Sequence, residues 1–233
     1  MTDLAEATRH AFELLISGDA DLWRIIAISF EVSGAAILIA TPPAILTAFL
    51  LAYGRFPGRR LLISLFSTLL SVPAVVVGLT LYLLLSNAGP LGDWRLLFTQ
   101  KAMILGQIVL AFPILVAMGH AALQSVDKRA WETARTLGAS PARAFWTLLR
   151  ESRFGLLAAL LAAYGRIIAE VGASMMLGGN ILGYTRNIPT AIALETSKGE
   201  FAQGIALGAI LLLLAFTLNG LLHHVQGRGM ARS

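Results

Sequence analysis

The sequence predicts an all-α, polytopic membrane protein with five transmembrane helices. Of its 233 residues, 57% are hydrophobic and 13% are charged, whereas a typical soluble domain has about 25% charged residues. Five apolar segments reach the roughly 20 residues that a helix needs to cross about 30 Å of hydrocarbon. Unpaired backbone groups are too costly in lipid for irregular crossings, so we expect these segments to be helices.

The five expected spans follow one another along the chain. They cover residues 23–53, 61–86, 102–123, 154–177 and 201–223. Prolines lie inside the first three of them, at Pro42, Pro43, Pro73 and Pro113. Because proline removes a backbone hydrogen bond and favours a kink, we expect bends in these three spans.

The segments on either side of the spans complete the predicted domain organisation. Residues 1–22 form an N-terminal periplasmic or interfacial segment, in which Leu4 and Ala11 fall near one helical face. This pattern favours a helix on the membrane surface over residues 4–16, with a mobile polar tail as the alternative. Residues 23–224 form one transmembrane domain, as expected for this length, and residues 225–233 form a cytoplasmic tail.

The charged residues predict the orientation in the membrane. The first link carries Arg55, Arg59 and Arg60 and no acid, and the long link over residues 125–153 has more basic than acidic residues. Lys and Arg favour the cytoplasmic side, so we expect the N-terminus outside and the C-terminus in the cytoplasm. The net charge of +5 lies in the gaps between apolar segments, and this pattern predicts topology-setting charge and no nucleic-acid partner.

The long polar link before the fourth span predicts two short helices joined by a glycine turn. Ala134 and Leu137 share an apolar helical face. Gly138 follows at the position where a left-handed C-terminal cap is favoured. Ser140 then offers an N-cap, and Pro141 offers the first position of a second helix. A hairpin lying on the lipid surface is one interpretation, and a hairpin that docks on a partner protein is the other.

Residues 131–138 read Trp-Glu-Thr-Ala-Arg-Thr-Leu-Gly and resemble the Glu-Ala-Ala…Gly signature of ATP-binding-cassette (ABC) importer permeases. Thr133 replaces the first alanine, and the Leu-Pro pair that often follows in the family is absent. The resemblance implies the MetI-like fold of type I importers and a cytoplasmic coupling hairpin over residues 127–150. In that family the hairpin docks on an ATPase. The residues to which the resemblance assigns ATPase coupling are Trp131, Glu132, Thr133, Ala134, Leu137 and Gly138.

The same resemblance implies the partners. Two copies of the chain would form the pathway as a homodimer in the bacterial inner (plasma) membrane. A cytoplasmic ABC ATPase dimer and a periplasmic or surface-anchored solute-binding protein would complete the importer. The chain has no Gly-x-x-x-x-Gly-Lys-Ser/Thr loop. We therefore expect a transport subunit without enzymatic activity and without a cofactor of its own, with ATP and Mg on the partner ATPase.

Three ionisable residues fall inside the expected spans, namely Glu31, Arg166 and Glu170. Such residues are costly in lipid and usually pair. Arg166 and Glu170 are four residues apart on one helix, and Glu31 and Arg166 both lie about 18 Å from the inner face at 1.5 Å per residue. We therefore predict one charge cluster linking the first and fourth spans. It is either structural or, with the hydroxyl of Ser174, part of an anion pathway.

Residues 170–192 carry a second resemblance, to the oxyanion permeases for molybdate, tungstate and sulfate. It rests on Glu-Val-Gly-Ala at 170–173, on Gly179-Asn180, and on Thr185, Pro189 and Ala191-Ile192. The continuation Ala-Leu-Glu-Thr-Ser-Lys-Gly-Glu-Phe at 193–201 is most similar to tungstate permeases. The resemblance implies import of tungstate by alternating access, with molybdate or sulfate as alternatives.

Two local features of this region predict its backbone. Pro189 with Thr190 predicts a short outer helix that continues to about residue 196. Gly178-Gly179-Asn180 favours a plain turn over an anion-binding loop.

Other classes of protein fit the sequence less well. A self-sufficient secondary anion transporter or channel would have inverted repeats with matching broken helices, and no repeat is apparent. An intramembrane enzyme would need a metal cluster or a nucleophile with a base. The four histidines, His10, His120, His223 and His224, form no metal-binding spacing with carboxylates. We therefore expect no metal site and no catalytic residue.

Overall fold

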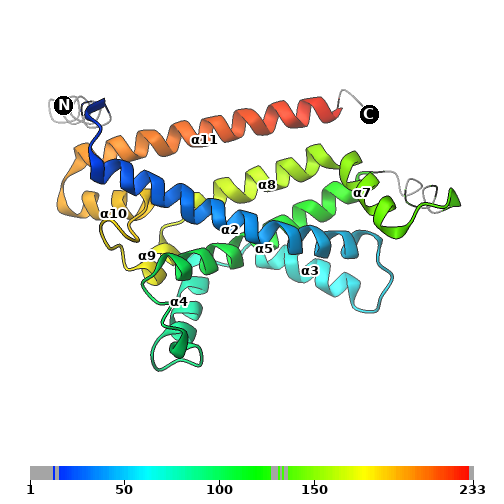
Figure 1. Cartoon of the computed structure of the whole chain (residues 1–233), viewed down its shortest axis with the longest axis horizontal. Helices are drawn as coiled ribbons and strands as arrows, with labels where there is room; N and C mark the ends of the chain where they lie inside the picture. The colour runs from blue at the N-terminus through cyan, green and yellow to red at the C-terminus, as the bar shows by residue number, and fades with distance from the viewer. Residues whose placement is uncertain (1–12, 14–15, 127–130, 132, 134–135, 231–233) are drawn as a thin grey trace. The chain divides into compact units, whose positions relative to one another are not determined.

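The computed structural model describes residues 13, 16–126, 131, 133 and 136–230, with side chains up to residue 221 (Figure 1). Over this part of the chain the regular structure is helical, with one short 3-10 helix, η1 (Gly92–Trp94), and no strand. The predicted all-α fold is therefore confirmed. The interfacial helix expected over residues 4–16 lies almost entirely outside the described residues.

Three of the five expected spans are unbroken helices. They are α2 (Ala20–Tyr53), α5 (Gln100–Gln124) and α11 (Phe201–Met230). In the described part of the chain these three are long and apolar enough to cross a membrane, and the number rises to five if each of two bent helix pairs counts as one span. Pro42, Pro43 and Pro113 remain inside α2 and α5.

The second expected span is broken where a proline predicted a bend. It consists of α3 (Arg59–Leu69) and α4 (Ala74–Leu85). Pro73 is the N-cap of α4 and has an extended backbone with ψ 131°. Proline disfavours a helical conformation in the residue before it, so the helix ends before Pro73 and a new one begins after it.

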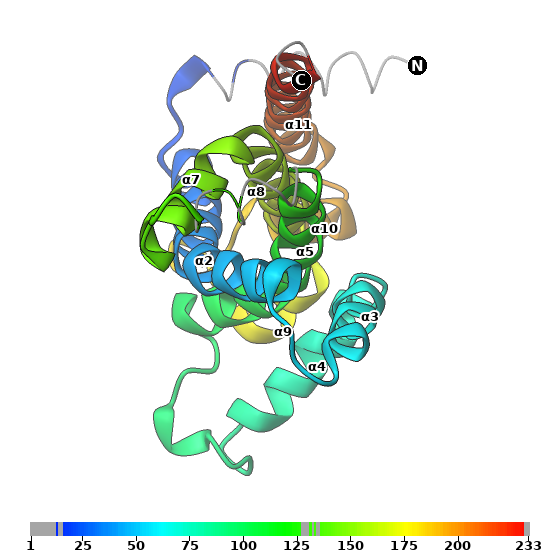
Figure 2. The same ribbon diagram turned by 90° about the vertical axis from the view of Figure 1, so that its right-hand side faces the viewer.

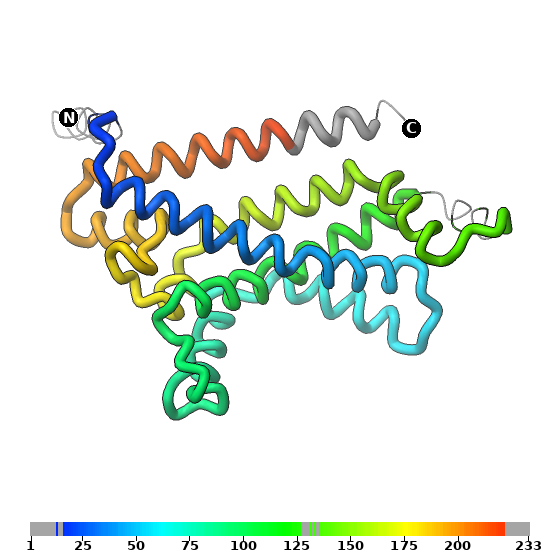
Figure 3. The backbone as a smooth tube through the Cα atoms, in the orientation of Figure 1, coloured from blue at the N-terminus to red at the C-terminus, as the bar shows by residue number. Residues whose placement is uncertain are grey.

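The fourth expected span is also broken, and here the prediction of one continuous helix over residues 154–177 was wrong. It consists of α8 (Arg153–Ile168) and α9 (Gly172–Gly178), bent by 61°. The turn between them can be followed along the tube in Figure 3. No proline lies at this break, so the side chains around it must cause the bend.

The hairpin before α8 has the predicted local structure. Trp131, Thr133 and Thr136 are helical, and Gly138 follows with a positive φ of 83°. The second helix is α7 (Pro141–Glu151), and the Ser140 side chain caps it by accepting a hydrogen bond from the backbone N–H of Arg143. The glycine turn and the serine cap are therefore confirmed.

The region after α9 also follows the prediction. Gly179 and Asn180 both have positive φ angles, 69° and 52°, so this segment is a turn. Helix α10 (Ile188–Lys198) begins one residue before Pro189, so the short helix predicted there is present. Asn187 and Thr190 form a reciprocal capping box at its start, which satisfies two backbone donors that would otherwise lack partners.

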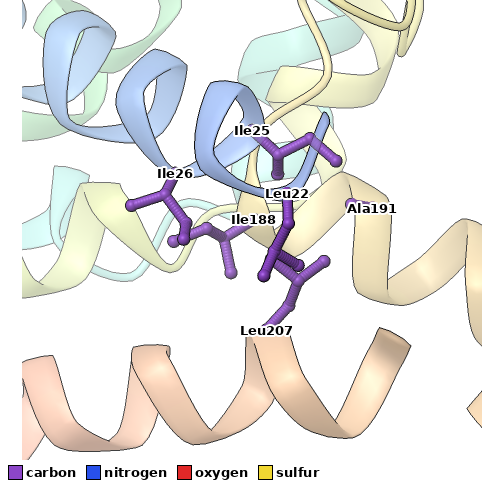
Figure 4. Packing of buried hydrophobic residues seen from close by; sticks show 6 residues of the cluster. All are labelled: Leu22, Ile25, Ile26, Ile188, Ala191 and Leu207. Carbon is purple, nitrogen blue, oxygen red and sulfur yellow. The ribbon is translucent and has the colours of Figure 1, made fainter. Parts of the chain in front are cut away.

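The chain packs into two compact units that alternate along the sequence. The first unit comprises Met1–Ile37, Val72–Leu110 and Tyr164–Thr217, and the second comprises Leu38–Ser71, Ala111–Ala163 and Leu218–Ser233. A core of the first unit joins the start of α2 to α10 and α11. Its buried side chains come together in Figure 4 and are Leu22, Ile25, Ile26, Ile188, Ala191 and Leu207.

Within the first unit, α4 and α9 lie side by side, as Figures 1 and 2 both show. Small residues make this contact possible. A Cβ atom on Gly78 would lie 2.8 Å from the Cα of Ala173, and one on Gly172 would lie 2.6 Å from a methyl carbon of Val75. Glycine therefore allows the two helix backbones to approach closely, as is common between helices in membranes.

Large apolar side chains remain exposed on the helices that could span a membrane. Leu38 of α2 is 76% exposed, and Phe216 of α11 is 75% exposed. A soluble monomer rarely exposes apolar surface in contiguous patches. This surface is suited to lipid or to another membrane-embedded protein surface.

Candidate functional site

The first candidate site is the hairpin that begins at Trp131, in the second unit. Trp131 packs into a cluster of four aromatic rings with Phe49 and Tyr53 of α2 and Phe145 of α7. The ring centroids of Trp131 lie 5.5 Å from Phe49 and 5.9 Å from Tyr53, and Phe49 lies 4.8 Å from Phe145. These separations are within the 4.5–7 Å range that aromatic pairs prefer. The hairpin is therefore anchored on the C-terminal end of α2.

The end of α2 is itself held by hydrogen bonds. The Arg59 guanidinium donates to the carbonyl oxygens of Leu51 and Ala52, which are among the last carbonyls of the helix and lack intrahelical partners. A cation is also favoured at this end of a helix. The Tyr53 hydroxyl donates to the carbonyl of Leu123 at 2.9 Å, which ties α2 to the end of α5.

The glycine turn of the hairpin is exposed. Leu137 is 82% exposed, and a Cβ atom on Gly138 would meet nothing within 4 Å. Gly138 is therefore required by its positive φ and not by a close neighbour. Thr133 is also exposed. Of the predicted coupling residues, Glu132 and Ala134 lie outside the described part of the chain.

The second candidate site is the break between α8 and α9, in the first unit. The Glu170 carboxylate binds both halves of the broken span. One oxygen accepts a hydrogen bond from Arg166 Nη1 at 2.7 Å, and the other accepts from the backbone N–H groups of Gly172 at 2.9 Å and Ala173 at 3.3 Å. The pairing of Arg166 with Glu170 is therefore as predicted. The Glu170 side chain is 7% exposed, and that of Arg166 is 50% exposed.

These contacts explain why the fourth span is broken between α8 and α9. The first N–H groups of α9 have no partners within that helix, and Glu170 supplies one. On the other side of the break, the carbonyl of Ile167 accepts a hydrogen bond from Nε2 of Gln107 in α5 at 3.3 Å. Side-chain partners thus replace the backbone bonds that the bend removes. In the sequence, the features that indicate this break are the carboxylate of Glu170, two residues before Gly172, and the polar residue Gln107 in the third span.

Glu31 does not join this cluster. In the described part of the chain it has no hydrogen bond or ion pair with Arg166 or Glu170, and it is exposed. Equal depth in the membrane does not bring two side chains together, because each helix can present them in different directions. Ile28 and Val32 of α2 are buried, and at 3.6 residues per turn Glu31 falls outside the face that they share.

Ser174 is buried in α9 and is 2% exposed. Among the described residues its hydroxyl oxygen has no hydrogen-bond partner. Buried polar atoms usually have partners, so this hydroxyl is one of a few exceptions among the described residues.

The segment that follows α9 is held by buried polar contacts. The hydroxyl of Ser29 in α2 accepts a hydrogen bond from the backbone N–H of Ile188 at 2.7 Å. The Glu195 side chain is 5% exposed and is paired with Lys198 at 3.2 Å and Arg186 at 3.9 Å. A buried carboxylate needs such partners, so Glu195 is explained by the packing of α10. In the described residues no group of three or more potential metal ligands comes together.

The apolar helices, which include two bent pairs, and the hairpin are compatible with a membrane transport subunit, and the sequence comparison shows the class. Residues 44–229 match the family described as binding-protein-dependent transport system inner membrane component. The chain belongs to this family and is an ABC permease.

Individual relatives are similar over nearly the whole chain. The tungstate uptake system permease protein of Campylobacter jejuni is 41% identical over 218 residues, which cover 94% of this chain and 91% of that protein. The protein of the same description from Peptoclostridium acidaminophilum is 36% identical, covering 97% and 99%. The molybdenum transport system permease protein of Escherichia coli is 33% identical, covering 88% and 97%.

Solved structures support the fold. An amino acid ABC transporter chain superposes with a TM-score of 0.66 at 17% identity and covers 93% of this chain and 98% of its own. A chain of the MetNI methionine ABC transporter gives 0.63 at 18% identity, covering 92% and 97%. The predicted MetI-like fold is therefore confirmed.

Proposed function

We propose that this chain is the permease subunit of an ATP-driven importer that carries tungstate across the inner membrane. The observation that carries the proposal is the similarity to two tungstate uptake system permease proteins, at 41% and 36% identity over at least 94% of the chain. The molybdenum transport permease of Escherichia coli is less similar, at 33% over 88% of the chain. This difference favours tungstate over molybdate.

The hairpin is proposed to dock on a cytoplasmic ABC ATPase dimer, which would bind and hydrolyse ATP with Mg. Its anchoring by Trp131 and its exposed turn at Leu137 and Gly138 support this role. An element that is fixed at its base and free at its tip can carry force to a partner. Glu132, Thr133 and Ala134 are proposed to contact the ATPase on the strength of the sequence resemblance. This chain would then be a transport subunit without catalysis of its own.

The remaining partners follow from the same proposal. Two copies of the chain would form the pathway, with lipid covering the apolar surface that they leave exposed. A periplasmic or surface-anchored solute-binding protein would deliver the oxyanion on the outer side, near α10. The excess of basic residues in the links supports an outer N-terminus and a cytoplasmic C-terminus.

The ion pair at the break is proposed to lie on the anion pathway. The charge of Glu170 is compensated by Arg166 and by the two amides of α9, and Glu31 adds no negative charge to this pair. The half-exposed Arg166 keeps N–H donors that an oxyanion could contact. The hydroxyl of Ser174 would offer another donor if the bend opened. Weak, dispersed contacts suit a pathway, because a tight site would retain the ion.

The metal content of cells tests the proposed cargo. We would grow cells that lack this gene with tungstate and molybdate, both at limiting concentration, and measure tungsten and molybdenum, with the gene restored as the control. We expect tungsten to fall to background while molybdenum is unchanged. Loss of both metals would make the protein a broader oxyanion importer. Loss of neither would contradict the proposal and favour sulfate transport or a channel.

A further inference from the structure

The ring contacts of the hairpin join it to the C-terminal end of α2. Trp131 lies edge-on to Phe49, with the ring planes at 66°, and is tilted by 30° against Tyr53. Phe49 and Tyr53 are four residues apart on α2, and their ring centroids lie 5.2 Å from each other. Trp131 therefore contacts two adjacent turns of one helix face.

Phe145 extends the contact to the second helix of the hairpin. Its ring is perpendicular to that of Phe49, at 90° and 4.8 Å between centroids. Both arms of the hairpin, at Trp131 and at Phe145, thus meet the same ring of α2. A displacement of the hairpin cannot leave the Phe49 ring in place without opening a gap, and packed protein interiors resist such gaps.

The receiving end of α2 is held on its other sides. Arg59 binds its last carbonyls, and the Tyr53 hydroxyl binds the carbonyl of Leu123. These bonds limit fraying of the last turn of α2. A displacement of the rings should therefore move the last turn of α2 as a unit, because that turn is not free to unwind.

We propose that Phe49 and Tyr53 are positioning residues that receive the ATP-driven displacement of the hairpin through Trp131 and pass it to α2. This inference rests on the proposed docking of the hairpin on an ATPase. The rings on α2 then determine how much tungstate is transported for each ATP hydrolysed. Docking strength should depend on the exposed turn and not on these rings.

The test uses the full transporter, with its ATPase and binding protein, reconstituted in liposomes. The quantity measured is tungstate transported per ATP hydrolysed. Phe49→Ala removes three ring pairs, so we expect this ratio to fall about tenfold, while the ATPase co-purifies as with the parent chain. Phe49→Tyr keeps the ring and should keep the ratio. Tyr53→Phe keeps the ring but removes the bond to Leu123, and should change the ratio less than Tyr53→Ala does.

Phe66→Ala is the matched control. Phe66 and Phe112 form a ring pair in the same unit, with centroids 5.9 Å apart and planes at 55°, but among the described residues neither ring pairs with an aromatic ring of the hairpin. Replacing Phe66 by alanine should lower the unfolding temperature, as Phe49→Ala does, and leave the ratio unchanged. If Phe49→Ala keeps the parental ratio, or if Phe66→Ala lowers it equally, the proposal is overturned.

Two further measurements keep the test decisive. If Phe49→Ala does not fold, Phe49→Leu replaces it, because leucine fills space without a ring. In a chain with Trp131 as its single tryptophan, ATP should shift the Trp131 emission, and Phe49→Leu should reduce that shift. If the ATP-induced shift of the Trp131 emission is the same with Phe49→Leu as with Phe49, the proposal is contradicted. A parent transporter that moves no tungstate, or binds no ATPase, would instead overturn the proposed function.

Discussion

Glu170 lies in an otherwise apolar span, and its surroundings supply every partner that a buried carboxylate needs. Arg166 provides the counter-charge, and the amides of Gly172 and Ala173 provide neutral donors. Leaving such a charge unpaired in a low-dielectric environment would cost several kcal/mol. The contacts of Glu170 therefore offset the cost of burying its charge, and they also stabilise the bend of the fourth span.

Replacing Glu170 tests this arrangement. Glu170→Gln keeps an oxygen for the two amides but places an NH2 group against Arg166, so we expect a loss of roughly 1–3 kcal/mol in the free energy of unfolding. Combining it with Arg166→Met should cost less than the sum of the two single changes, because the pair is then removed together. Thermal unfolding of the purified proteins measures both effects.

Glu31 serves as the control for that series. It has no ion pair with Arg166 in the described structure, so Glu31→Gln and Arg166→Met should be additive within about 0.5 kcal/mol. A larger coupling between them would restore the three-residue cluster that the sequence predicted.

The helices α4 and α9 are each the second half of a broken span, and they pack against one another through Gly78, Gly172 and Ala173. The two breaks turn α4 and α9 away from the first halves of their spans, and each short helix packs against the other. The close approach of the two backbones compensates for the packing that such short helices lack within themselves.

A single methyl group at this contact should therefore have a measurable cost. Alanine is favoured over glycine inside a helix by about 1 kcal/mol, yet Gly78→Ala should destabilise the protein by about 1–3 kcal/mol, because its Cβ meets the Ala173 backbone. Gly208→Ala in α11 is the matched control, since a Cβ there meets nothing within 4 Å. It should be neutral or stabilising. Chemical or thermal unfolding in detergent compares the two, and equal effects would contradict the assigned contact.

At the scale of the whole molecule, five crossings with basic links on one side predict an N-terminus outside and a C-terminus in the cytoplasm. The described helices allow this number only if α3 with α4, and α8 with α9, each form one crossing. The orientation then places the loop at Asn87 outside and the hairpin inside.

Cysteine labelling tests the orientation, because the chain has no cysteine of its own. A membrane-impermeant maleimide added to intact cells (spheroplasts where an outer membrane is present) should label Asn87→Cys. Leu137→Cys, which replaces a side chain that is 82% exposed, should react only after the membrane is opened. The reverse pattern would place the hairpin outside and exclude docking on a cytoplasmic ATPase.

Composition and local pattern were enough to determine the helical membrane fold, the glycine turn at Gly138, the serine cap at Ser140 and the break at Pro73. Each of these features depends either on interactions between residues that are close in the sequence or on the lipid that the apolar segments require as solvent. The docking signature and the oxyanion resemblance were likewise readable in continuous stretches of sequence.

Only the tertiary structure decided which charged residues meet, where the fourth span breaks and what the hairpin rests on. Glu31 and Arg166 are separated by 135 positions in the chain, Gln107 and Ile167 by 60, and Phe49 and Trp131 by 82. Whether residues so far apart in the chain meet depends on helix rotation and on the packing of distant segments, and Glu31 and Arg166 do not meet. Hydropathy reports the depth of a residue in the membrane, but not which neighbour its helix face will meet.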